Sequence, residues 1–199
     1  MQRNIKNLIG DNLDATDGEI GTVEDFYFDD HTWTVRYLGV KTGNWLSRHN
    51  VLISPSTVLP HSWESGMFPV GLTKEQIRHS PDIDMERAAP KGNPHLRSTQ
   101  KMTGYHIHAS DGDIGHVTDF IMDDQTWWIS YLVVDTHSWI GGKRVLIAVR
   151  HVKEVKWENS KVVVKITTEA IKKSSAIDPW NYIIPEGDRL TRMTPVLVA

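Results

Sequence analysis

The chain has no cysteine and no long apolar segment in its 199 residues. The absence of cysteine excludes disulfide bonds, thiolate metal sites and a cysteine nucleophile. No apolar run approaches the length of about 18 residues that a membrane-spanning helix needs. Residues 1–6, MQRNIK, lack the apolar core of a secretory signal. We therefore expect a cytoplasmic protein without a membrane span.

Motifs of the common enzyme classes are also missing. The chain contains no nucleophile elbow, phosphate-binding loop or dinucleotide fingerprint. Aspartate is frequent, but most aspartates fall in turns, where this residue bonds its own backbone amides. Asp25 and Asp119 fall on strand patterns, where we expect them to accept backbone amide hydrogen bonds. We expect no catalytic activity, no cofactor and no small-molecule substrate.

Most of the sequence is present twice. Residues 10–84 align with residues 104–178 at a constant offset of 94 without a gap, and 31 of the 75 aligned pairs are identical. A repeat of this length marks a folding unit, so we predict one domain in each copy. Residues 85–103, with prolines and glycine and no strand pattern, are predicted to be a linker. Residues 179–199 form an apolar C-terminal tail, predicted to fold back or to pair with a partner's edge.

Each copy has the pattern of short strands joined by turns. Asp-Gly pairs are strong turn signals, and alternating apolar residues follow them at 20–28 and 114–122. Thr73 and Gln76 form a capping box that predicts a short helix after the last strand. Apolar residues on both faces of short strands favour a sheet that closes on itself. We predict an all-β fold of two small tandem barrels, each followed by a short helix and packed as a pseudo-twofold pair.

A longer motif is shared by the two copies. It reads DGEIGTVEDF at residues 17–26 and DGDIGHVTDF at residues 111–120, and matched DD-x-TW, YL-x-V and VLI segments follow. This pattern resembles the PRC-barrel family, especially its bacterial tandem members. The barrel of the photosynthetic reaction-centre H subunit and the C-terminal domain of a ribosome-maturation protein are similar. The resemblance implies a small β-barrel that serves as a non-catalytic adaptor. The chain shows neither the membrane helix of the first relative nor the N-terminal domain of the second, so we transfer neither role whole.

Tryptophan distinguishes the two copies. Six of the eight tryptophans occupy matched positions and are expected in the core or in the seam between copies: Trp33, Trp45, Trp63, Trp127, Trp139 and Trp157. Trp128 has no counterpart, because Thr34 occupies the aligned position. An aromatic residue that the repeat does not require is typical of a binding surface, although local packing is the alternative. We name Trp128, together with Trp45 and Trp139, as candidate partner-binding residues.

The histidines of the second copy stand at positions where the first copy carries other residues. His106 and His108 are two residues apart, so on a strand both side chains point the same way. Two imidazoles at this spacing can bind zinc or nickel if a third ligand joins them. His116 or His137 could be that ligand. Ordinary surface histidines are the alternative interpretation.

Two functions fit these observations. The duplication, the missing enzyme motifs and Trp128 favour a protein-interaction or scaffold module that binds a protein partner or itself. The alternative is an RNA-binding or ribosome-assembly factor, because residues 143–173 carry nine basic and three acidic residues and basic segments neutralise phosphates. The isoelectric point near 6.3 and the lack of a regular series of aromatic and basic residues weigh against RNA.

Overall fold

The computed structural model describes residues 1–43, 46, 50–60, 65–80, 95–136 and 144–173. This part of the chain is mostly β, with two sheets and only short helices. The chain divides into two compact units, one of Lys6–Lys101 and the other of Met1–Ile5 with Met102–Ala199. We call them the first-copy unit and the second-copy unit. The predicted mostly β fold with one sheet for each copy is confirmed.

The first-copy unit is built on one sheet with the strand order β5-β4-β3-β2-β6, and β7 pairs with β3 beside this path. Its strands are β2 (Asn12–Ala15), β3 (Gly18–Asp29), β4 (Thr34–Thr42), β5 (Asn50–Ile53), β6 (Met67–Pro69) and β7 (Leu96–Ser98). The short helices along this stretch are η1 (Ile5–Leu8), η3 (Pro55–Thr57), α1 (Lys74–Arg78) and α2 (Thr99–Met102). Thr73 caps α1 in a capping box with Gln76, as predicted.

The second-copy unit has the strand order β11-β10-β9-β8-β13-β12, and β1 pairs with β9. Its strands are β1 (Gln2–Asn4), β8 (His106–Ala109), β9 (Gly112–Asp123), β10 (Ile129–Asp135), β11 (Arg144–Ala148), β12 (Val152–Lys156) and β13 (Lys161–Val164). Its short helices are η6 (Val149–His151), η7 (Trp157–Asn159) and α3 (Thr168–Lys173). No helix in the described ranges has the length and apolar character needed to cross a membrane.

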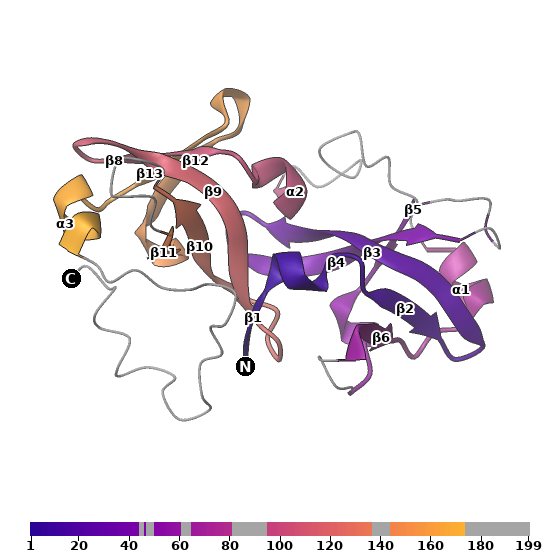
Figure 1. Cartoon of the computed structure of the whole chain (residues 1–199). Coiled ribbons are helices and arrows are strands. Elements are labelled where there is room, and N and C mark those ends of the chain that lie inside the picture. The colour runs from indigo at the N-terminus through magenta and orange to yellow at the C-terminus, as the bar shows by residue number, and fades with distance from the viewer. Residues whose placement is uncertain (44–45, 47–49, 61–64, 81–94, 137–143, 174–199) are drawn as a thin grey trace. The chain divides into compact units, whose positions relative to one another are not determined.

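The two sheets have the same register. Phe26 pairs with Leu38 between β3 and β4, and the residues 94 positions later, Phe120 and Leu132, pair between β9 and β10. The long strands β3 and β9 both bend along their length (Figure 1). The repeat in the sequence is therefore a repeat of strand pairing. Closure of each sheet into a barrel and pseudo-twofold packing of the units stay predictions.

The glycine of the repeated Ile-Gly pair has a packing role in both units. A Cβ atom on Gly21 would overlap the carbonyl of Lys41, and a Cβ atom on Gly115 would overlap the carbonyl of Asp135. These carbonyls lie on β4 and β10, the neighbours of β3 and β9. Glycine therefore permits the close approach of the two longest strands of each sheet.

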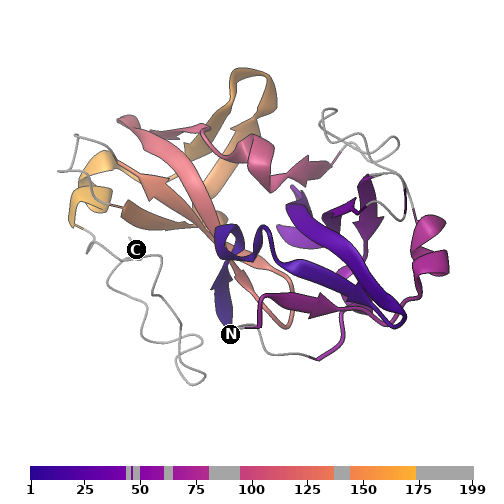
Figure 2. The ribbon, with the colours of Figure 1, turned by 45° about the vertical axis from the view of Figure 1, so that its right-hand side comes forward.

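In each unit, one strand of the sheet comes from outside the copy that forms the rest of that sheet. This strand lies just before the other copy in the sequence. β1, at the start of the chain, pairs antiparallel with β9 of the second copy (Figure 2). β7, just before the second copy, pairs antiparallel with β3 of the first copy. The predicted linker at 85–103 thus contains a strand and the helix α2, which sequence analysis did not predict. A strand of three residues is too short to show an alternating pattern.

The two strands from outside the copies, β7 and β1, contribute differently to the two hydrophobic cores. The corresponding clusters consist of Tyr27, Leu52 and Leu96 in the first-copy unit and of Ile121, Val133 and Leu146 in the second-copy unit. Leu96 on β7 fills part of the first cluster, whereas the aligned residue on β1 is Gln2. Val133 occupies the position that aligns with Gly39. In the second-copy unit, where β1 carries the polar Gln2, the larger Val133 thus supplies apolar volume to the core.

Asp25 connects β3 to the beginning of α2. Its carboxylate is buried and accepts hydrogen bonds from Phe26 N at 2.8 Å, Thr99 Oγ1 at 2.8 Å, Gln100 N at 3.1 Å and Ser98 Oγ. Burial raises the pKa of Asp25, although the hydrogen bonds act in the opposite direction. In the second-copy unit, Asp119 Oδ1 accepts a hydrogen bond from Phe120 N at 2.7 Å. The expectation that both aspartates accept backbone amide bonds is confirmed.

β1 pairs with β9 of the second copy, and β7 pairs with β3 of the first copy. Each of these short strands should therefore protect the amides of the copy with which it pairs, and not those of the copy that follows it in the sequence. Replacing residues 2–4 by Gly-Ser-Gly should speed amide hydrogen exchange in β9 at least about tenfold, because the β1 pairing is lost. The matched replacement of residues 96–98 should speed exchange in β3 instead. Hydrogen-exchange mass spectrometry measures both. Faster hydrogen exchange in β3 after the change at 2–4, with β9 unaffected, would contradict the pairing of β1 with β9.

The substitution Asp25→Ala should lower the free energy of unfolding of the first-copy unit by about 3 kcal/mol, because Ser98, Thr99 and Gln100 lose their acceptor and an unsatisfied buried polar group costs about 1–3 kcal/mol. Urea unfolding followed by circular dichroism measures the change. Glu24→Ala is the control: Gln100 Nε2 bonds the backbone carbonyl of Glu24, so this change should cost under about 0.5 kcal/mol. Equal effects of the two substitutions would refute this role of Asp25.

The raised pKa of Asp25 also predicts a pH dependence. An aspartate whose pKa is higher in the folded than in the unfolded chain binds more protons when folded, so stability falls as the pH rises. The decrease should begin near the ordinary aspartate value of about 3.9 and end at the raised pKa of the folded state. Asp25→Asn cannot ionise and should lack this component. Urea unfolding of both proteins between pH 3 and 8 tests the difference, and parallel curves would disprove it.

Candidate functional site

Trp128 lies on the surface of the second-copy unit. Its side chain is 43% exposed, and it sits between the β9–β10 turn and the first residue of β10. Its backbone carbonyl accepts a hydrogen bond from Asp123 N at 2.9 Å, which fixes the residue at the end of β9. Exposure of a large aromatic ring to water is unfavourable unless a partner covers it. Trp128 is thus exposed in the second-copy unit, and its role in binding a partner stays a prediction.

The neighbouring tryptophan belongs to the fold of the turn. Trp127 and its counterpart Trp33 both have a left-handed backbone, with φ of 59° and 55°. Each donates its backbone N–H to an aspartate carbonyl four residues earlier, at 2.8 Å. Trp33 also stacks on Phe28 with ring centroids 5.2 Å apart. The backbone conformation and hydrogen bond are common to both turns, whereas the stacking on Phe28 belongs to the first copy, because Met122 stands at the aligned position. Trp128 is the additional tryptophan, without a counterpart in the first copy.

A second exposed apolar side chain belongs to the same turn region. The backbone carbonyl of Met1 accepts a hydrogen bond from Asp124 N at 2.8 Å, and the Met1 side chain is exposed. Within the described ranges, the strongly exposed large apolar side chains are Met1, Leu59, Met67 and Trp128. The other two partner-binding candidates, Trp45 and Trp139, lie outside the described residues. We call Met1 and Trp128 the exposed apolar pair.

The histidines named as metal candidates do not form a group of three ligands in the part of the second copy that is described. His106 and His108 lie on β8, where His106 is exposed and pairs across the strands with His116. His108 Nδ1 contacts Asp113 Oδ1 at 2.7 Å, and this hydrogen bond lowers the pKa of Asp113. His137 lies outside the described residues.

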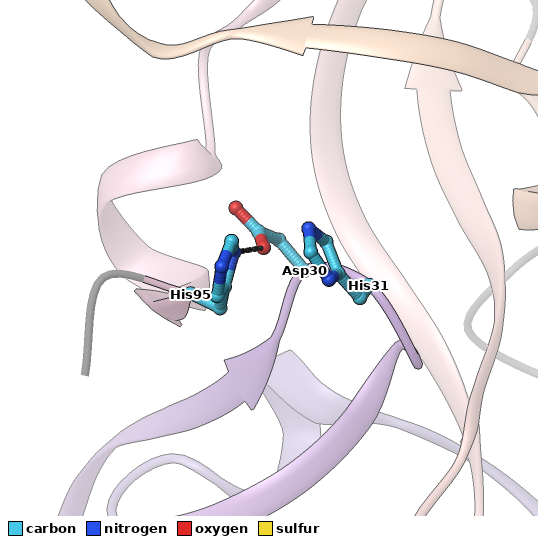
Figure 3. Close-up of side chains that lie close together, drawn as sticks. All are labelled: Asp30, His31 and His95. Carbon is cyan, nitrogen blue, oxygen red and sulfur yellow. Dashed lines mark hydrogen bonds and ion pairs between the residues drawn. The ribbon is translucent and has the colours of Figure 1, made fainter.

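Three other side chains in the described ranges do form such a group, and all belong to the first-copy unit. The possible ligand atoms of Asp30, His31 and His95 all lie within 4.8 Å of one another. Figure 3 shows the three side chains converging from the β3–β4 turn and from the residue before β7. His95 Nδ1 contacts Asp30 Oδ1 at 3.1 Å, and the rings of His31 and His95 have centroids 3.8 Å apart. We call these residues the Asp-His cluster.

The β3–β4 turn holds two members of the cluster in place. Asp29 Oδ1 accepts hydrogen bonds from the backbone N–H groups of His31 at 3.0 Å and Thr32 at 2.9 Å. Burial acts to raise the pKa of Asp29, but these amide bonds outweigh it and the pKa is lowered. Aspartate at the start of a turn commonly bonds the following amides in this way. The backbone of His31 is therefore positioned by the turn itself.

The third member is positioned by β7. Asp30 N donates a hydrogen bond to the backbone carbonyl of His95 at 2.9 Å, one residue before β7 begins. Arg97 on β7 donates from Nε to Asp30 Oδ2 at 2.9 Å. The carboxylate of Asp30 is only 10% exposed, whereas the His95 side chain is 44% exposed. The Asp30 carboxylate is thus buried and held by β7, whereas the imidazole of His95 is partly exposed.

The second-copy unit has the same ion pair without the imidazoles. Arg3 Nε donates to Asp124 Oδ2 at 3.0 Å, and the N-terminal ammonium group contacts the other oxygen of Asp124. Gln125 stands at the position of His31. Sequence analysis missed the cluster because His95 precedes the aligned repeat and lies 65 residues from Asp30. The replacement of His31 by Gln125 between the copies was the one signal in the sequence.

Comparison with known proteins identifies the family. The model of the PRC-barrel domain matches residues 2–63 and residues 107–171, which together exceed half of the chain. The two matched regions agree with the two sheets. A search of curated proteins found no significant match. The chain therefore belongs to the PRC-barrel domain family and carries the domain twice.

Proposed function

We propose that this tandem PRC-barrel protein is a non-catalytic interaction module of the cytoplasm, which binds a protein partner through the surface around Trp128. The exposure of Trp128 carries the proposal. The first copy forms the same turn and the same strand register with Thr34 at this position. The fold therefore does not require the tryptophan, and its exposed ring is available for recognition.

The size of the exposed ring indicates a useful binding energy. A tryptophan side chain buries up to about 250 Å², so the exposed 43% of Trp128 corresponds to about 100 Å². At about 25 cal/mol per Å², covering this area contributes about 2.5 kcal/mol. That is more than a tenfold gain in affinity. Tryptophans of this kind are common among residues that dominate protein interfaces.

A protein partner is favoured over RNA by the packing of the second copy. Trp157, the aromatic residue nearest the basic strands, packs against Tyr105 with ring centroids 5.7 Å apart. A ring in this contact is less available for stacking on a base. The exposed side chains on and around β12 also alternate in charge, because Lys156 lies 3.9 Å from Glu154. A continuous basic surface would suit a phosphate backbone better.

The substitution Trp128→Thr tests the proposal, because it installs the residue that the first copy carries at this position. We expect an unchanged circular dichroism spectrum and at least about a tenfold loss in affinity, as the buried-area argument gives. Partners captured by the purified chain are identified by quantitative mass spectrometry and titrated one by one, and sedimentation measures self-association.

The control is Met67→Thr, which removes an equally exposed apolar side chain, 42% against 43%, from β6 in the other unit. It should leave the binding intact. Equal binding by wild type and the Trp128→Thr variant would reject the proposal. Retention of total RNA on filters at low salt, lost on substitution of Lys153 and Lys156, would favour the RNA-binding alternative instead.

A further inference from the structure

We propose that the Asp-His cluster, Asp30, His31 and His95, binds one divalent transition-metal ion such as Zn²⁺, Ni²⁺ or Cu²⁺. Two imidazoles and one carboxylate are the donor set that such ions prefer, whereas Mg²⁺ and Ca²⁺ favour oxygen ligands. The site lies wholly in the first-copy unit, whereas Trp128 of the proposed function belongs to the second-copy unit.

The distances fit an ion after small side-chain movements. Ions of this class lie about 2.0–2.2 Å from nitrogen and oxygen ligands, so ligand atoms around one ion are about 3 to 4 Å apart. The possible ligand atoms of the cluster lie within 4.8 Å of one another. His31 is exposed and His95 is nearly half exposed. Their rings can therefore rotate by the remaining distance without disturbing the core.

Arg97 acts on the carboxylate ligand from outside the site. Its Nε holds Asp30 Oδ2 at 2.9 Å, while Asp30 Oδ1 faces His95. Partners of this kind orient a ligating carboxylate. The guanidinium also places a positive charge near the ion, which lowers the affinity by Coulomb repulsion. The three protein ligands leave at least one coordination position for water or a group from another molecule.

The second copy shows that the fold does not need the imidazoles. Arg3 and Asp124 form the equivalent ion pair there, and Gln125 replaces His31. The ion pair between β7 or β1 and the turn is therefore a shared structural contact. The two imidazoles are an addition specific to the first copy.

An ion at this site would join two distant parts of the first-copy unit. Asp30 and His31 belong to the β3–β4 turn, and His95 stands one residue before β7. Three contacts are already present: the Asp30–His95 backbone bond, the Asp30–His95 side-chain contact and the Arg97–Asp30 ion pair. The ion would add a further link between the same two segments. Metal binding should therefore slow the local opening of β7 from β3, since a ligand that binds only the closed form stabilises it.

The test uses the full chain without a histidine tag. Isothermal titration with Zn²⁺, Ni²⁺ and Cu²⁺, each alone, should show one ion per chain for wild type. The substitution His31→Gln, which installs the residue of the second copy, should weaken binding at least about tenfold, because even partners outside the ligand set change affinity by about 10- to 100-fold. The control replaces His106 and His108 together by glutamine and should bind as tightly as wild type.

Electron paramagnetic resonance of the Cu²⁺ complex provides a second measurement. Nitrogen hyperfine structure should show two ligating nitrogens in wild type and one in either His31→Gln or His95→Asn. Hydrogen exchange in β7 should slow on addition of Zn²⁺ in wild type and not in His31→Gln, whose metal-free melting curve verifies that it folds. Absence of saturable binding to wild type, full binding by His31→Gln, or loss of binding in the control would each overturn the proposal.

Discussion

The pairing of each long strand with a strand from outside its own copy is the constraint on which the rest of the structure depends. β3 and β9 bend through their sheets, and on one side of each the own-copy strand pairs only with the N-terminal part. β7 and β1 pair with the C-terminal part. The contact is closed by backbone pairing, by the Arg–Asp ion pair at the turn and, in the first-copy unit, by the buried Asp25. The compact units are therefore offset from the sequence repeats.

Much of this architecture follows from local sequence signals. Asp-Gly turns, alternating apolar residues and the Thr73–Gln76 capping box are short-range patterns, and the structure contains the elements that they predict. β1 and β7 could not be predicted, because three residues carry no period and their partners are distant in sequence. The difference between Trp128 and Thr34 marked Trp128 as a candidate for a binding surface, but the sequence left local packing open as the alternative. The meeting of Asp30 with His95 depends on the β3–β7 pairing, which no local pattern encodes.

The two copies separate contacts that serve the fold from contacts that are specific to one unit. Three features are present in both copies: the Asp–Arg ion pair, the tryptophan with a left-handed backbone, and the glycine at the close approach of β3 to β4 and of β9 to β10. Two of the positions that differ between the copies lie in or next to the otherwise matched turn after the long strand: His31 against Gln125, and Thr34 against Trp128. One copy carries ligand-type side chains there, and the other carries an exposed aromatic ring.

The place of β1 has a consequence for the order of events on the ribosome. The partners of residues 2–4, at 121–123, are synthesised about 120 residues later than residues 2–4 themselves. At roughly 5 to 20 residues per second, the first strand waits about 6 to 24 s for its partner. β7, in contrast, emerges when β3 has already been made. The first-copy unit can thus assemble during translation, and the nascent N-terminus must remain free of other strands until the second copy arrives.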